Sequence, residues 1–225
     1  MIERRRMVGI LVVWACLLPA SARAQPAAAR FEAAFGVRWI GGTSFGARDA
    51  TETTPAGGQF VLFSTDTRLS GLGALEARVG VRLTRSAQVE AEGSYGRGDL
   101  RTAVRGDTEG AQGLVASDRI TQYTIGGGLV WRIDRWQLAR DVVPFVSAGA
   151  GYLRQLHAEN VLVEDGGMYY VGGGLNYLLG APADPQARAI GLRSDLRLVV
   201  RRGGIAFDRR GHPAPAVGAS FFVRF

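Results

Sequence analysis

The chain has 225 residues and a formal net charge of +7 at pH 7, and 32 of its residues are glycine. It contains one cysteine, Cys16, which excludes an intramolecular disulfide and a metal site built from several thiolates. All 27 basic residues are arginine, but they are scattered among 20 acidic residues and form no basic run interleaved with aromatic residues. Despite its positive charge, the chain therefore does not have the composition of a nucleic-acid-binding protein.

Residues 1–24 have the features of a secretory signal peptide. Arg4, Arg5 and Arg6 precede an apolar run over residues 7–18, and small residues follow before a cut at Gln25. The apolar run is shorter than the ~20 residues of a membrane-spanning helix. Lipid attachment at Cys16 is disfavoured because Trp14 and two leucines flank that residue unsuitably. We predict export and cleavage, which leaves one domain, residues 25–225, with 23 basic and 19 acidic residues and a net charge of +4.

The predicted mature chain consists mainly of stretches in which apolar and polar residues alternate with a period of two. Such alternation predicts β-strands with one apolar and one polar face. Eight strands are expected, at residues 30–40, 69–84, 88–100, 119–133, 142–157, 168–179, 189–202 and 217–225. The segment 41–67 is rich in Gly, Thr, Ser and Asp and is predicted to be a long loop, although Phe60–Phe63 has strand character.

The chain ends on an aromatic residue that completes an apolar strand face. This face consists of Val217, Ala219, Phe221, Val223 and Phe225, with Phe222 the exception on the opposite face. The segment resembles the C-terminal signature of bacterial outer-membrane β-barrels, which the barrel-assembly machinery reads in that group. The glycine-rich runs Val143–Tyr152 and Tyr170–Tyr177 likewise resemble the small outer-membrane β-barrel domain family, the OmpA/OmpX-like barrels.

The resemblance implies an all-β fold, an eight-stranded antiparallel up-and-down transmembrane β-barrel of a Gram-negative outer membrane, and it implies no single activity. A soluble lipocalin-type barrel has the same alternation with its apolar face inside, so it remains an alternative. Aromatic residues near strand ends favour the membrane. The predicted interfacial aromatics are Trp39, Tyr123, Trp131 and Trp136. The predicted lumen charge network is Glu76, Arg78, Arg82, Glu90, Glu92, Arg132, Arg193, Asp195 and Arg197.

The turn after the second predicted strand can be placed by parity. Apolar positions are odd-numbered in both flanking strands, so opposed residues must have numbers with an even sum. A three-residue loop, Arg85–Ala87, satisfies this condition and has a common hairpin length. It sets Arg82 opposite Glu90 as a favourable cross-strand pair.

The predicted function is structural or surface-interacting, with a lumen filled by paired charges. An eight-stranded barrel is about wide enough for its own interior side chains, and unpaired charges there would be costly. A narrow ion or small-solute pore is the alternative, and a lipid-modifying enzyme is the third possibility. The candidate base for catalysis is His157, with Glu159 and Asp165 nearby in sequence, but no nucleophile has a suitable position. His212 is expected at the edge of a loop.

We therefore expect no enzyme, metal site or cofactor, and partners limited to outer-membrane lipid, lipopolysaccharide and the barrel-assembly machinery. The ligand of the outer loops is not identified by any motif. Four loop arginines, Arg48, Arg105, Arg209 and Arg210, have the chemistry to contact lipid phosphates, but solvated loop charges are the favoured interpretation.

Overall fold

A computed structural model describes residues 30–55, 57–105, 115–136, 139, 141–157, 162–179, 189–205 and 210–225. The predicted signal peptide, Glu159 and Arg209 lie outside the described residues. The regular structure consists of β-strands and one short 3-10 turn, η2 (Asp134–Trp136). No helix in the described ranges has the length and apolarity to cross a membrane.

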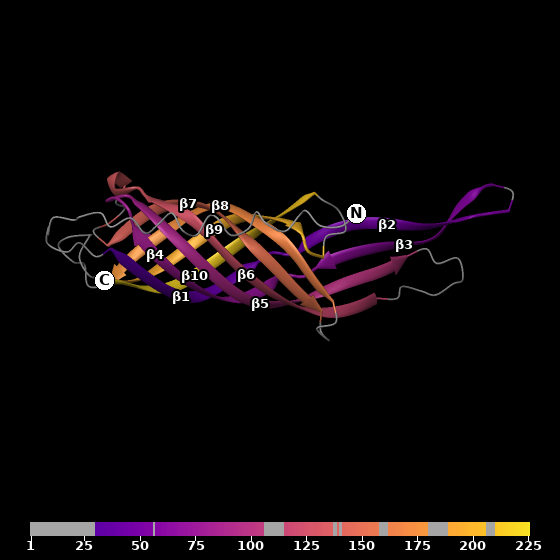
Figure 1. Ribbon diagram of the computed structural model, residues 1–225, viewed down its shortest axis with the longest axis horizontal. Coiled ribbons are helices and arrows are strands. Elements are labelled where there is room, and N and C mark those ends of the chain that lie inside the picture. Colours follow the sequence, from indigo (N-terminus) through magenta and orange to yellow (C-terminus); the bar gives the residue numbers. More distant parts are fainter. Residues whose placement is uncertain are drawn as a thin grey trace, which may run out of the picture.

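Eight long strands close into an antiparallel barrel (Figure 1). Each strand pairs with its neighbours in the barrel, and β1 pairs with β10 to close the sheet. Around the barrel, the strands are β1 (Phe31–Ile40), β4 (Leu72–Arg82), β5 (Ala87–Arg105), β6 (Val115–Arg132), β7 (Val142–His157), β8 (Val163–Leu179), β9 (Ala189–Gly203) and β10 (Gly211–Arg224). The predicted all-β, eight-stranded barrel is thus confirmed.

The segment predicted to be a long loop is instead a β-hairpin, β2 (Thr43–Thr53) and β3 (Gln59–Leu69). Figure 1 shows it extending beyond the barrel along the long axis. Residues 64–69 of β3 pair with the end of β5, whereas the outer part of the hairpin pairs only with itself. Both faces of this ribbon carry polar residues, so the alternation that marks the barrel strands is missing from its sequence.

The hairpin gives the two ends of the barrel convenient names. The end that carries β2 and β3 is called the hairpin end. The opposite end is called the terminal end, because Phe31 and Phe225 meet there through two backbone hydrogen bonds of 3.0 and 2.9 Å.

The turn between β4 and β5 differs from the parity prediction by two residues. The Leu83 N–H donates to the Ala87 carbonyl at 2.9 Å, and the Thr84 hydroxyl accepts from the Ala87 N–H at 2.9 Å. The Thr84 side chain thus closes the turn over Thr84–Ser86. Arg82 consequently lies opposite Gln88, and the predicted Arg82–Glu90 pair is wrong. Parity was correct, but it fixes a register only to within a multiple of two residues.

The barrel buries its polar face and exposes its apolar face. Ile125 is 71% exposed and Phe35 61% on the outer wall, whereas inward-facing Arg197 and Glu90 are 2% and 3% exposed. A soluble barrel of the lipocalin type would have the reverse distribution, so that alternative is excluded. An apolar outer wall instead suits strands surrounded by lipid.

Candidate functional site: the barrel lumen

Ion pairs cross the lumen from β5 to β9. Arg193 Nη1 contacts Glu90 Oε1 at 2.6 Å, and Arg197 Nη1 contacts Glu92 Oε2 at 2.7 Å. All four side chains are at most 3% exposed. Because β5 and β9 are separated by three strands in either direction around the barrel, these pairs span its cross-section. The centre of the lumen is therefore occupied by charged side chains that neutralise each other.

Four further contacts extend the Arg197–Glu92 pair, and these residues together with the Arg193–Glu90 pair are called the central network. Arg197 Nε lies 2.7 Å from Asp195 Oδ1, and Arg78 Nε lies 3.0 Å from Glu76 Oε1. Arg38 on β1 contacts Glu76 and also approaches Glu92, with Nη2 3.5 Å from Oε2. Arg38 belongs to the polar face of its strand but was not part of the predicted lumen charge network. Its even number in β1, shared with the inward-facing Gly36, was the available signal.

A second ion pair lies at the seam that closes the barrel. Arg224 Nη2 contacts Glu32 Oε2 at 2.9 Å, and these two residues are direct partners in the β1–β10 register. Gln88 donates to Glu32 at 3.3 Å and to Glu90 at 3.0 Å. Neither Glu32 nor Arg224 belonged to the predicted network. This chain of polar contacts links the terminal-end pair to the central network.

Aromatic rings inside the lumen stack on the arginines. The Cζ of Arg193 lies 4.1 Å from the ring centroid of Phe145, and the Cζ of Arg197 lies 4.4 Å from that of Tyr170. A guanidinium over a ring face gains a cation–π attraction that is strongest where water is excluded. Phe145, which breaks the polar pattern of its strand, therefore has a place inside. The ring of Tyr170 is accommodated by Gly149, where a Cβ would lie 2.5 Å from the tyrosine Cζ.

Apolar side chains bound the charged network toward both ends. Along the inner face of β9, Ala189 precedes Arg193, Asp195 and Arg197, and Val199 follows them. Ala189 packs with Leu178 and Phe222 on the terminal side. The cluster that contains Val199 lies on the hairpin side and draws on five strands: Ile40, Leu72, Ala74, Met168, Tyr170, Val199, Ala214 and Ala216. Along the inner face of β9 the lumen is thus layered, apolar then charged then apolar, while the Glu32–Arg224 pair lies level with Ala189.

Not every lumen arginine is paired. Among the described residues, seven buried arginines face five buried acids, Glu32, Glu76, Glu90, Glu92 and Asp195, an excess of two positive charges, and the half-buried Arg82 and Glu164 add one charge of each sign. Arg82 and Arg201 have no hydrogen-bond partner for any of their three side-chain nitrogens within the described ranges. Arg132, another member of the predicted network, donates to the carbonyl of Arg85.

The outer wall carries the predicted aromatic residues toward its two ends. Trp39 and Tyr123 lie on the hairpin side, and Trp131 and Trp136 lie at the terminal end; each is at least 44% exposed. The predicted assembly-signal residues Val217, Ala219, Phe221, Val223 and Phe225 also face outward. Phe222 points inward and is fully buried. Interfacial anchoring and recognition of this strand during assembly stay predictions.

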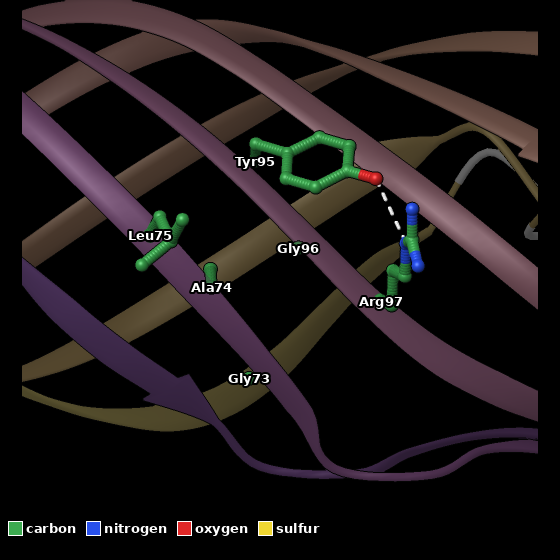
Figure 2. A pocket seen from close by; sticks show the side chains of 6 residues that line it. All are labelled: Gly73, Ala74, Leu75, Tyr95, Gly96 and Arg97. Carbon is green, nitrogen blue, oxygen red and sulfur yellow. Dashed lines mark hydrogen bonds between the residues drawn. The ribbon is translucent and has the colours of Figure 1, made fainter.

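A shallow groove of about 450 Å³ lies between β4 and β5 (Figure 2). Its lining comprises Gly73, Ala74, Leu75, Tyr95, Gly96 and Arg97. Arg97 Nε donates to the Tyr95 hydroxyl at 2.8 Å, the contact dashed in Figure 2. A Cβ added at Gly73 would meet no atom within 4 Å, so the groove is open at that point. The groove offers a cation beside an apolar surface on the outer wall.

His157 contacts a different acid from Asp165, one of the two acids near it in sequence, and the other, Glu159, lies outside the described residues. Its Nδ1 contacts the carboxylate of Asp118 on β6, whereas Asp165 lies 3.5 Å from Arg154 Nε. The His157 Nε2 has no hydrogen-bond partner among the described residues. His212 packs its ring against Phe45 with centroids 5.2 Å apart. Within the same ranges, no group of three or more His, Cys, Asp or Glu residues has the arrangement of a metal site.

Two of the loop arginines have defined positions. Arg48 lies in β2 and its side chain is exposed, and Arg210 is exposed next to the start of β10. Arg105 is the last residue of β5.

The fold matches that of known membrane barrels. Neisserial surface protein A aligns over 87% of this chain and 96% of its own chain, with a TM-score of 0.51 and 12% identity. This is the fold of a small outer-membrane β-barrel. The outer-membrane protein OprG of Pseudomonas aeruginosa aligns over 88% of this chain and 96% of its own, with a TM-score of 0.49 and 12% identity. The chain matches no protein-family model and no curated relative.

Proposed function

We propose that the protein is an integral outer-membrane barrel with a structural or surface-interaction role, and that its lumen does not conduct. The observation that carries this proposal is the layered lumen. Ion pairs from β5 to β9 span the cross-section, and apolar clusters lie on either side of them. An ion that crosses the barrel would have to separate buried ion pairs, which is costly because each leaves an uncompensated charge.

Single-channel recording in a planar bilayer tests the closed lumen. We expect the folded wild-type protein to show no steady openings. The matched variants Glu90→Gln and Arg193→Met each remove one partner of the same crossing pair and should raise leak events, whereas the outward-facing Arg202→Met should not. Steady wild-type openings that change in the two lumen variants would make the alternative, a narrow pore, the function.

The β2–β3 hairpin is the proposed interaction element. Its outer part projects beyond the barrel, as Figure 1 shows, and Phe60 and Val61 are 42% and 46% exposed there. Apolar side chains on an aqueous protrusion, next to unpaired strand edges, suit contact with another surface or chain. In an outer membrane this end would face the exterior, where lipopolysaccharide, other cells or host molecules are the available partners.

Replacing Phe60 and Val61 by serine tests the role of the hairpin. We expect the variant to fold, because these residues make no barrel contact through β5. Cells of a non-adherent strain that express it should bind a host-cell monolayer less than cells that express the wild type. Serine at Thr51 and Glu52, in the same hairpin, provides the control. Equal binding by all three strains would contradict this part of the proposal.

The third possibility, a lipid-modifying hydrolase, has less support. His157 faces a carboxylate as a catalytic base would, but no hydroxyl or thiol of the described residues is hydrogen-bonded to its Nε2. We also propose, from the apolar outer wall and the groove beside Arg97, that the barrel contacts membrane lipid directly. Recognition of the closing strand by the barrel-assembly machinery is part of the same proposal.

A further inference from the structure

Arg201 is a buried cation for which the described residues supply no counter-charge. It lies on the inner face of β9 and is 2% exposed, and its Nε, Nη1 and Nη2 have no hydrogen-bond partner in the described part of the chain. No described acid lies within ion-pair distance of it. Arg193 and Arg197, on the same face of the same strand, each contact a carboxylate at 2.6–2.7 Å. The difference between these arginines is therefore one of position, not of residue type.

The surroundings of Arg201 are mostly apolar. Met168 and His212 are its register partners on β8 and β10, and Val199 is the preceding inward residue. Met168 and Val199 belong to the apolar cluster that bounds the central network on the hairpin side. Glu164, the nearest inward-facing acid along β8, lies opposite Gln155, and its Oε2 has no partner in the described ranges.

A guanidinium in such a place needs an anion. Arginine stays protonated in proteins, so Arg201 cannot remove its charge by losing a proton. An uncompensated buried charge is strongly destabilising. Water molecules would satisfy the N–H donors but leave the charge in place. The described lumen, with two more arginines than acids, does not supply the missing negative charge.

We propose that Arg201 binds a small soluble oxyanion, a carboxylate or a phosphate, on the hairpin side of the apolar cluster. The planar guanidinium presents paired N–H donors that match the two oxygens of such a group. The apolar cluster that contains Met168 and Val199 separates this site from the paired network. Since Arg201 faces the lumen and not the outer wall, the occupant is a soluble anion and not a phospholipid headgroup. The proposal does not depend on the surface role of the hairpin.

Thermal unfolding in the presence of anions tests the site. The protein is purified in a non-ionic detergent and titrated with sodium phosphate, or with sodium acetate, against sodium chloride at constant ionic strength. We expect a saturable rise in the unfolding temperature of the wild type with at least one of the two oxyanions, because a ligand that binds only the folded state stabilises it. Arg201→Met should weaken the apparent affinity about ten- to a hundredfold, the range for hydrogen bonds to a charged group.

Arg202→Met is the matched control, since this neighbour has the same chemistry but faces outward. It should respond to the anions as the wild type does, and Arg201→Lys should bind more weakly because it keeps the charge but loses the planar fork. If the unfolding temperature of the wild type shows no saturable response to either oxyanion, the proposal is overturned. Water, and not an anion, would then solvate the guanidinium. An equal response in wild type and Arg201→Met would overturn the proposal as well. Stabilisation by phosphatidylglycerol vesicles, but not by free oxyanions, would contradict a soluble occupant.

Discussion

The middle of the lumen and its hairpin end use the same residue on the same strand in opposite ways. Arg193, Arg197 and Arg201 follow one another at intervals of four residues on the inner face of β9. The first two meet carboxylates from the opposite side of the barrel, and the third meets an apolar layer. All three arginines have the same orientation on β9. The residues on the facing strands therefore determine whether an arginine forms an ion pair in the lumen or keeps an uncompensated positive charge.

The largest effect is expected from removing a central arginine. Arg197→Met leaves Glu92 and Asp195 buried without their closest cation, so the free energy of unfolding should fall by about 3–5 kcal/mol. Each acid keeps a second nearby cation, since Arg38 lies 3.5 Å from Glu92 and Arg78 lies 3.6 Å from Asp195. We therefore expect a loss at the lower end of that range. Urea unfolding in lipid vesicles measures it. Arg202→Met should stay within about 0.5 kcal/mol of the wild type, and an equal loss in both would show that the pairing has no role.

A smaller effect is expected from removing a ring that stacks on a central arginine. Phe145→Leu keeps an apolar side chain but loses the cation–π contact with Arg193, which is worth roughly 0.5–2 kcal/mol. Volume-similar core exchanges add less than about 1.5 kcal/mol. The same unfolding measurement should therefore give a loss of about 1–3 kcal/mol. Phe145→Leu in an Arg193→Met background should cost less, and an unchanged cost would argue against the stacking contribution.

The smallest effect is expected where an arginine has no acid partner. Arg82→Gln removes a half-buried guanidinium without a described hydrogen-bond partner, near the like charges of Arg132 and Arg224. Its effect on the free energy of unfolding should be within about 0.5 kcal/mol, in either direction. A loss as large as that of Arg197→Met would mean that the terminal end is as tightly paired as the centre.

Alternation along the chain predicted the barrel strands and their two faces, and the aromatic residues near strand ends favoured the polar face, with most of the lumen charges, as the inner one. The hairpin was missed because Thr43–Thr53 carries polar residues on both faces and the apolar residues of Gln59–Leu69 are consecutive, so neither strand shows the period-two alternation. Four further lumen residues could have been predicted from the sequence, because each has the parity of an inward-facing residue in its strand: Arg38, Glu32, Arg224 and Arg201.

Pairing across the lumen could not be predicted in the same way. Glu90 and Arg193 are 103 residues apart, and no local pattern specifies which inward residues of β5 and β9 lie at the same height. That height depends on every register around the barrel, and one of these, between β4 and β5, was predicted two residues off. His157 shows the same limit, because Asp165 is near it in sequence while Asp118 contacts it from the adjacent strand.

The central claim is that ion pairs across the barrel fill the lumen, and a double-mutant cycle on Glu90 and Arg193 tests it most directly. The free energies of unfolding are measured for the wild type, Glu90→Gln, Arg193→Met and the double variant. A direct pair at 2.6 Å predicts a coupling of about 1–3 kcal/mol, with the double variant more stable than the sum of the single losses implies. Additivity within about 0.3–0.5 kcal/mol would contradict a contact between these side chains and, with it, the closed lumen.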